Sequence, residues 1–275
     1  RVPLMSREEI KETSVLESLK NIITNRPLLA VILANFFNSF KSVGGSSESY
    51  FWLNNTGSLL NQTICGLFTG IPNYIMVPIA AKMVKKWGAR ATSIIAGLFG
   101  FFAYMTLFFV GFHPFGQTFK DHYIFNLIWV IFGLTICGLP NKILNVSGQI
   151  VTAEALDYME WKHGLRNEAL VTTVQGYFGK LATSVTGWLS GMVLTWINYV
   201  PLTDSLGNAV PQTDPTMLNG IWAVFCILPA LARGLYGVSF IIYPIHGDLQ
   251  QQMIVELAEK RAQRLAEQEA KDHQA

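Results

Sequence analysis

The sequence predicts an all-α membrane protein with six transmembrane helices, because its composition is strongly apolar and its apolar residues fall in long runs. Of its 275 residues, 51% are hydrophobic and 14% are charged, which suits a chain surrounded by lipid better than a soluble domain. A helix needs about 20 apolar residues to cross the hydrocarbon core of a bilayer. Six stretches approach or exceed that length: 28–53, 59–81, 92–112, 124–151, 169–200 and 218–245.

The basic residues outside these stretches predict the orientation in the membrane. They gather before residue 27, between 82 and 90, between 162 and 166 and in the C-terminal tail, whereas Lys120 stands alone on the opposite side. Cytoplasmic loops carry an excess of Lys and Arg, so both termini are expected in the cytoplasm. This topology accounts for the small positive net charge without a nucleic-acid partner. The predicted regions are a cytoplasmic amphipathic linker at 1–27, a six-helix bundle at 28–246 and a cytoplasmic amphipathic tail at 247–275.

The sequence carries none of the usual residue patterns of an enzyme. Its histidines are scattered, its three cysteines are single thiols inside apolar runs, and no glycine-rich phosphate loop is present. The one acidic group, at residues 154–160, is interleaved with Lys and Arg, which favours salt bridges over a metal ion. We therefore expect no catalytic activity, no metal and no cofactor.

Charged residues interrupt the predicted spans. Lys41 and Glu48 lie in the first span beside a polar stripe that includes Asn35 and Asn38, and Arg233 lies near the middle of the sixth. A charge at the bilayer centre costs about 2.5–3.5 kcal/mol on the insertion scale, so it normally faces a cavity or a partner. For Lys41 and Glu48 both interpretations stay open. Arg233 is expected to pair with Glu48, with another acid or with a backbone carbonyl rather than to contact a substrate.

The fourth span has the clearest polar pattern. Asn141, Asn145, Gln149 and Thr152 follow one another at steps of four, four and three, so they share one face of the helix, and Lys142 is adjacent. Hydrogen-bonding side chains on a membrane helix avoid lipid, so they line a cavity or hold helices together. The first span also combines a mid-helix Lys with a polar stripe, as expected if three-helix units repeat in inverted topology. This repetition favours the cavity.

A charged segment follows the fourth span. Glu154, Asp157 and Glu160 recur every three residues, so they share a helix face, and Lys162 and Arg166 follow within reach. By itself such a segment is more often a solvated connection. Its regular spacing and its position between two apolar runs favour a functional role over a simple connection.

The same segment resembles a motif of the glycoside-pentoside-hexuronide:cation symporters, the sugar carriers that include the melibiose permease. That motif is an Asp-Tyr-Gly-Glu-aromatic-Lys run ending in Arg; residues 157–158, 160–162 and Arg166 match it, whereas Met159 replaces the usual Gly. The resemblance implies the C-terminal half of a twelve-helix major facilitator fold, built of two inverted three-helix repeats. It also implies that the acidic and basic residues form ion pairs with the N-terminal six-helix half and close the inner gate.

The fifth span continues the resemblance. Its run 174–180 is similar to a helix of the melibiose-type carriers in which a Gln and a Lys contribute to the sugar site, and this implies a substrate role for Gln175 and Lys180. Asn145 stands where some of those carriers have an aromatic residue, which removes a stacking surface for the sugar. Small residues also fall at every fourth position of this span and predict a packing face: Gly179, Thr183, Gly187 and Gly191.

We therefore expect a fragment, starting at Arg1, of a sugar:cation symporter of the bacterial cytoplasmic membrane that works by alternating access. Lys180, Gln175, Asn145 and Gln149 are its predicted substrate-binding residues. The coupling ion would be Na⁺ or H⁺, and its site is expected in the N-terminal half. The alternatives are a related carrier of lysolipids or other amphiphiles, and a non-transporting membrane scaffold or sensor whose polar stripes bind partner helices.

Overall fold

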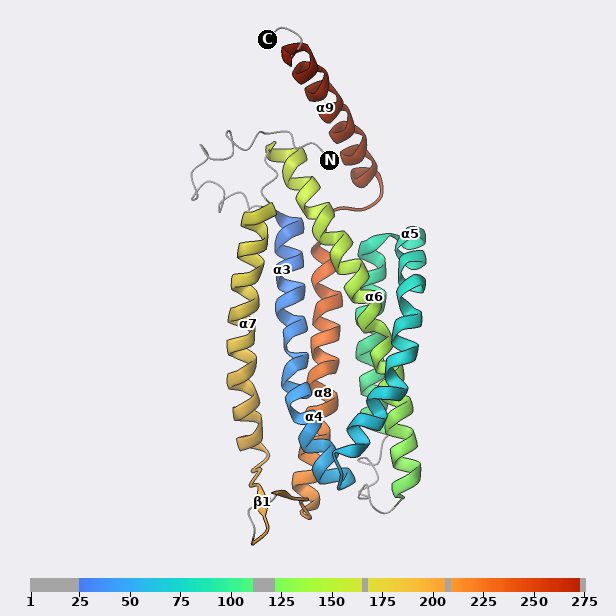
Figure 1. Ribbon diagram of the computed structural model, residues 1–275, viewed down its shortest axis with the longest axis vertical. Coiled ribbons are helices and arrows are strands. Elements are labelled where there is room, and N and C mark those ends of the chain that lie inside the picture. The colour runs from blue at the N-terminus through green and yellow to red at the C-terminus, as the bar shows by residue number, and fades with distance from the viewer. Residues whose placement is uncertain (1–24, 111–121, 165–167, 206–208, 273–275) are drawn as a thin grey trace.

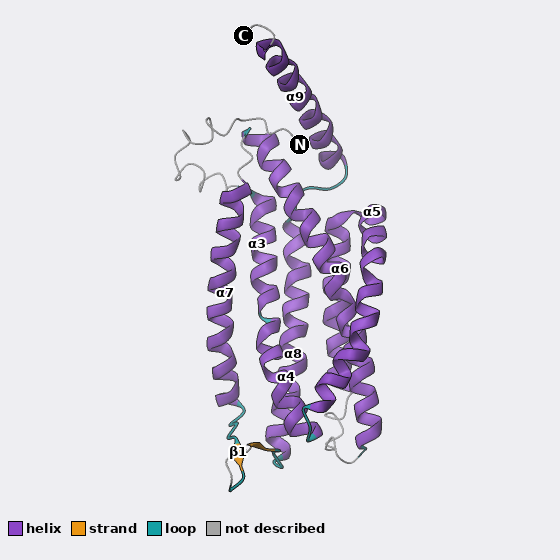
Figure 2. Ribbon diagram, in the orientation of Figure 1, coloured by secondary structure: helices purple, strands orange, loops and turns teal. Residues whose placement is uncertain are grey.

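The computed structural model describes residues 25–110, 122–164, 168–205 and 209–272, which form an elongated helical bundle and a terminal helix beyond one end of it (Figures 1 and 2). The predicted linker at 1–27 lies almost wholly outside the described residues. The elements in chain order are α3 (Arg26–Ser39), α4 (Lys41–Thr56), α5 (Leu60–Val110), α6 (Tyr123–His163), α7 (Glu168–Trp196), β1 (Leu202–Thr203), β2 (Ala209–Val210), α8 (Pro215–Ser239), η2 (Phe240–Ile242) and α9 (Asp248–Asp272).

The first predicted span begins as expected but is divided into α3 and α4. The side chain of Asn25 caps α3 by accepting a hydrogen bond from the Leu28 amide at 3.1 Å, and Pro27 lies in the first turn. The helix is interrupted at Phe40. Next to the interruption the Ser39 hydroxyl donates to the Asn35 carbonyl at 3.0 Å. Such hydroxyl contacts one turn back compete with the helix ladder and bend helices, which accounts for the break.

The second and third predicted spans are two legs of α5, which Figure 1 shows turning back on itself. The turn lies at Gly88, whose φ of 82° and ψ of 160° are not helical. This region of backbone space is open to glycine and costly for residues that carry a Cβ. The turn lies between the two predicted spans, within residues 82–91.

Among the residues that the structure describes, four helices are long and apolar enough to cross a membrane. They cover 26–56, 60–109, 123–163 and 215–242. The predicted fifth span corresponds to α7, which is rich in Gly, Ser and Thr and is not one of the four. Six separate spans are therefore not confirmed; within the described residues α5 alone contains two of the predicted spans as its two legs.

The bundle is built around α8, which packs against α3, α4 and α5. Its approach to α5 is close, because a Cβ added at Gly97 would lie 2.7 Å from the Cα of Gly237. The small-residue face predicted on α7 behaves differently: nothing in the described chain lies within 4 Å of a Cβ built at Gly179, Gly187 or Gly191. That face is left open, and α7 packs on α3 and α4 through its other side.

The predicted tail is helix α9, which extends beyond the end of the bundle where α6 also projects (Figure 1). Met253 and Leu257 are buried, with exposed fractions of 2% and 3%, so α9 is docked rather than fully solvated. Met253 belongs to the same apolar cluster as α6 residues, and Tyr158 and Trp161 pack against that cluster.

Candidate functional site

A cavity of about 510 Å³ lies between α3, α6, α7 and α8, and we call it the amide cavity. That volume is within the usual range for small-molecule sites. Its polar lining is Asn35 and Asn38 from α3, Asn145, Gln149 and Thr152 from α6, Gln175 from α7 and Tyr236 from α8. The structure thus brings together three of the four predicted substrate-binding residues, which the sequence had placed on two separate spans.

The amide cavity contains hydrogen-bonding capacity that the protein does not use. The Nε2 group of Gln175 is buried and has no hydrogen-bond partner among the described residues. A buried donor without a partner costs about 1–3 kcal/mol. A hydroxyl group of a bound solute would remove that cost. Asn145 and Gln149 are both exposed to the same cavity and each offers an amide donor and an acceptor.

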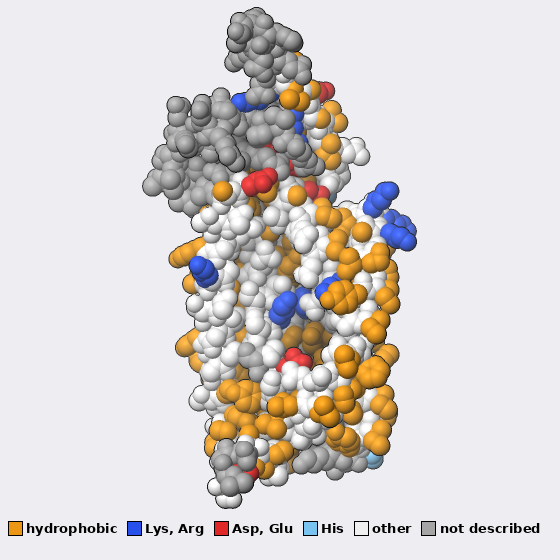
Figure 3. Space-filling view, in the orientation of Figure 1, with side chains coloured by type: hydrophobic (Ala, Val, Ile, Leu, Met, Phe, Trp, Pro, Cys, Tyr) orange, Lys and Arg blue, Asp and Glu red, His pale blue; other side chains and the backbone are white. Residues whose placement is uncertain are grey.

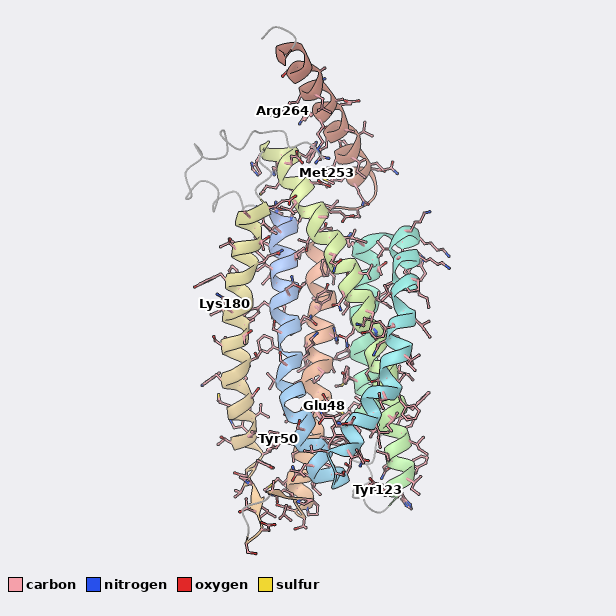
Figure 4. All side chains as sticks on the ribbon, viewed as in Figure 1. Glu48, Tyr50, Tyr123, Lys180, Met253 and Arg264 are labelled. Atoms are coloured by element: carbon pink, nitrogen blue, oxygen red, sulfur yellow. The ribbon has the colours of Figure 1, made fainter. Side chains whose placement is uncertain are left out.

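Lys180, the fourth predicted substrate residue, does not line the amide cavity. It lies five residues after Gln175, a displacement of about 140° around the helix axis, so the two side chains leave α7 in different directions. Lys180 is exposed, and Figure 4 labels it on α7 at the edge of the bundle. The structure therefore does not bring Lys180 and Gln175 together.

A second cavity of about 380 Å³ lies between α4, α5, α6 and α8, and we call it the charged cavity. Its lining includes Lys41 and Glu48 from α4, Asn73 from α5, Asn141 from α6 and Arg233 from α8. Figure 3 shows basic and acidic side chains around a hollow in the middle of this face, and Figure 4 labels Glu48 there. Of the two interpretations of Lys41 and Glu48, the structure supports cavity lining.

Arg233 was expected to pair with Glu48, with another acid or with a backbone carbonyl, and the partner that the structure gives it is a side-chain amide. Its Nη1 donates to the side-chain oxygen of Asn38 at 3.0 Å, and no ion pair joins it to Glu48 within the described residues. The reason is the arrangement of α3 and α8, which places the α3 amide, and not an acid, beside the guanidinium.

Lys142 lies outside both cavities, with its Nζ 4.8 Å from the ring centre of Tyr74 in a cation–π contact.

The acidic face of α6 is occupied by α9. Arg261 donates to Asp157 at 3.1 Å and to Glu160, whose side chain is fully buried. Glu154 accepts hydrogen bonds from the hydroxyl of Tyr243 at 2.9 Å and from Gln250 at 2.7 Å. The shared face predicted from the three-residue spacing is confirmed. These contacts with the tail are additional to the predicted contacts with an N-terminal half.

The predicted gate also includes two basic residues, Lys162 and Arg166. Lys162 lies with its Nζ 5.7 Å from the ring centre of Tyr158, and Arg166 lies outside the described residues. Sequence reasoning missed Arg261. Met253, Leu257 and Arg261 follow one another at steps of four and so share one face of α9, which is the signal that could have identified its docking side.

Burial would lower the pKa of Arg261, but its hydrogen bonds and attraction to Glu160 and Asp157 outweigh that effect and raise the pKa above its ordinary value. Arg261 is therefore held in its charged form. The Trp161 Nε1 group adds a second link between α6 and α9 by donating to Glu256 at 2.7 Å. This end of the bundle thus contains a network of hydrogen bonds and ion pairs in which α9 takes part.

Comparison with known proteins supports a transport function. Residues 4–247 match the family described as MFS/sugar transport protein. The chain is 30% identical to the uncharacterized symporter YjmB of Bacillus subtilis over 92% of its own length and 51% of that protein. It is 22% identical to the isoprimeverose transporter of Lactiplantibacillus pentosus, covering 92% of this chain and 49% of the relative. It is 26% identical to the putative sulfoquinovose importer of Escherichia coli, covering 82% and 45%.

The chain spans about half the length of the curated relatives it matches. The family match covers most of the chain, including every predicted span and both cavities. It confirms the resemblance that the charged segment and the fifth span indicated. The chain belongs to the MFS/sugar transport protein family of membrane transporters.

Proposed function

We propose that this chain forms the C-terminal half of a sugar:cation symporter that works by alternating access, and that the amide cavity is its share of the sugar site. The observation that carries the proposal is the group of amide side chains from α3, α6 and α7 around one cavity, with the Gln175 donor lacking a partner in the described chain. Sugar hydroxyls both donate and accept hydrogen bonds, as side-chain amides do, so the two are complementary.

The assignment to one half of a carrier rests on the extent of the chain and on its surface. The relatives are about twice as long, and α7 has an open face of small residues that would admit a neighbouring helix closely. In major facilitator carriers the substrate binds between two halves that rock against each other. We refer to the protein composed of both halves as the full-length carrier. Its location would be the bacterial cytoplasmic membrane, with both termini of this chain in the cytoplasm.

Cation coupling belongs to the same proposal. The family and the names of several relatives support transport and symport, and the coupling Na⁺ or H⁺ is proposed to bind in the N-terminal half. The acids Asp157 and Glu160 would contribute to closure of the cytoplasmic side in the outward-facing state, together with Arg261 of α9. Lys180 remains a substrate residue by resemblance alone, because its exposed position does not support that role.

Cysteine protection in the full-length carrier tests the sugar site. Cysteines placed at Asn145 and Gln175 should react with a small thiol reagent, and a transported sugar should slow the reaction at both positions. A cysteine at Thr203, which is exposed on β1 outside the cavity, is the matched control and should not be protected. Equal reaction rates with and without every sugar tested at Asn145 and Gln175 would refute the sugar site. Uptake of the protecting sugar with and without a Na⁺ or pH gradient then tests coupling.

A further inference from the structure

The charged cavity has an imbalance of charge that the amide cavity lacks. Lys41 and Arg233 bring two positive charges, and Glu48 is the one acid among its lining residues. Within the described chain Lys41 forms no ion pair, and the carboxylate of Glu48 accepts a hydrogen bond from Trp52 at 3.4 Å. One positive charge therefore remains without a counter-ion in the middle of a membrane-length bundle, where an unpaired charge is costly.

Arg233 gives a second, independent sign of a missing anion. Its side chain is 2% exposed, and its Nε group is buried without a hydrogen-bond partner among the described residues. A guanidinium stays protonated in proteins and presents five N–H donors in a planar fork that suits carboxylate and sulfonate oxygens. Asn38 satisfies one of these donors from one side. Arg233 is also one of the residues that line the charged cavity.

The two cavities are linked through this arginine. Arg233 lines the charged cavity, and the amide to which it donates, that of Asn38, lines the amide cavity. A cation is a poor candidate for the charged cavity because two positive side chains would repel it. Within the described chain, a purely structural role would leave one of the two cations without a compensating acid, because Glu48 is the one acid in the lining. An anionic group attached to a solute in the amide cavity would be attracted by both cations and would supply the missing negative charge.

We propose that the charged cavity is a subsite for an anionic substituent, a carboxylate or a sulfonate, carried by the sugar whose hydroxyls bind in the amide cavity. This inference rests on the proposed function and deepens it by naming the substrate class as acidic sugars. Lys41 and Arg233 bind the anion, whereas Glu48 partly cancels their positive charge and weakens the binding of an anion. The selectivity therefore depends on the difference between these charges.

The test measures the affinity of the purified full-length carrier in nanodiscs for three matched probes, methyl glucoside, glucuronate and sulfoquinovose, and for inorganic sulfate alone. The wild type should bind at least one sugar acid about tenfold or more tightly than methyl glucoside, as expected for a charge-assisted contact. Lys41→Gln should reduce that ratio about tenfold, whereas Glu48→Gln should increase it. Lys142→Gln, which removes a positive charge outside both cavities, is the matched control and should leave the ratio unchanged.

The opposite signs separate recognition from folding, because a structural role would make both substitutions weaken binding of all probes. Since Arg233 is buried and its replacement endangers folding, the conclusion rests on Lys41 and Glu48. Equal affinities for neutral and acidic sugars in every variant would overturn the subsite and leave the sugar carrier in place. Binding of none of the sugars by the folded wild type would remove the proposed function and the subsite with it. Sulfate binding as tight as that of the sugar acids would identify a site for a free anion and overturn the sugar assignment.

Discussion

Replacing Arg261 by glutamine should loosen the docking of α9 without unfolding the bundle. The guanidinium connects α9 to two acids of α6, and the side chain of Glu160 is 0% exposed while that of Arg261 is 18% exposed. A hydrogen bond to a charged group contributes about 1.5–3 kcal/mol, and the partial exposure of Arg261 places the expected loss near the lower limit. At 1.4 kcal/mol per factor of ten, the undocked population of α9 should rise about tenfold.

The buried Met253 and Leu257 should keep α9 docked most of the time, because each contributes about 1.5–3 kcal/mol of apolar burial. Amide hydrogen exchange measures the change directly: protection in the first turns of α9 should fall about tenfold in the variant, with the rest of the bundle unaffected. Lys260→Gln is the matched control, since Lys260 is exposed and its contact to the Trp161 carbonyl is long at 3.4 Å. If both variants exchanged at the wild-type rate, the ion pairs would not hold α9 and the reasoning would be refuted.

Three further predictions concern packing, gating and pH. Gly97→Ala should lower the stability of the bundle by about 1–3 kcal/mol and reduce its melting temperature, because the new Cβ would lie 2.7 Å from the α8 backbone, whereas Gly70→Ala on the same helix has open space and should not. Asp157→Ala should bias the full-length carrier toward the inward-open state, seen as increased labelling of cytoplasmic-side cysteines; unchanged labelling and unchanged transport would show that Asp157 has no gating role. Hydrogen bonds from Gln252 and Trp161 hold the pKa of Glu256 below its ordinary value of 4.5. The stabilisation from this carboxylate is therefore complete above pH 4.5 and is lost as the pH falls through the lowered pKa, so a spin label on α9 should become more mobile in acid, less so in Glu256→Gln.

Relations within one helix could be predicted from the sequence, because the helical period fixes which residues share a face. Of the predicted polar stripe, the residues from Asn145 to Thr152 line the amide cavity, whereas Asn141 lines the charged cavity. The steps of three from Glu154 to Glu160 place these acids on one face, which contacts α9 and Tyr243. The turn around Gly88 falls between two predicted spans, where basic residues interrupt the apolar sequence. These signals are local in the chain, so no tertiary information is needed to interpret them.

Relations between helices were decided by the tertiary structure alone. The sequence placed Gln175 and Lys180 in one site, but the rotation of α7 against α3 and α4 turns the first toward the amide cavity and leaves the second exposed. It likewise offered Glu48, another acid or a backbone carbonyl as the partner of Arg233, whereas packing puts Asn38 there and leaves two cations beside one acid in the charged cavity. The physical reason is that the apolar runs determine which segments enter the membrane, while the rotation and pairing of helices follow from side-chain packing between segments far apart in sequence.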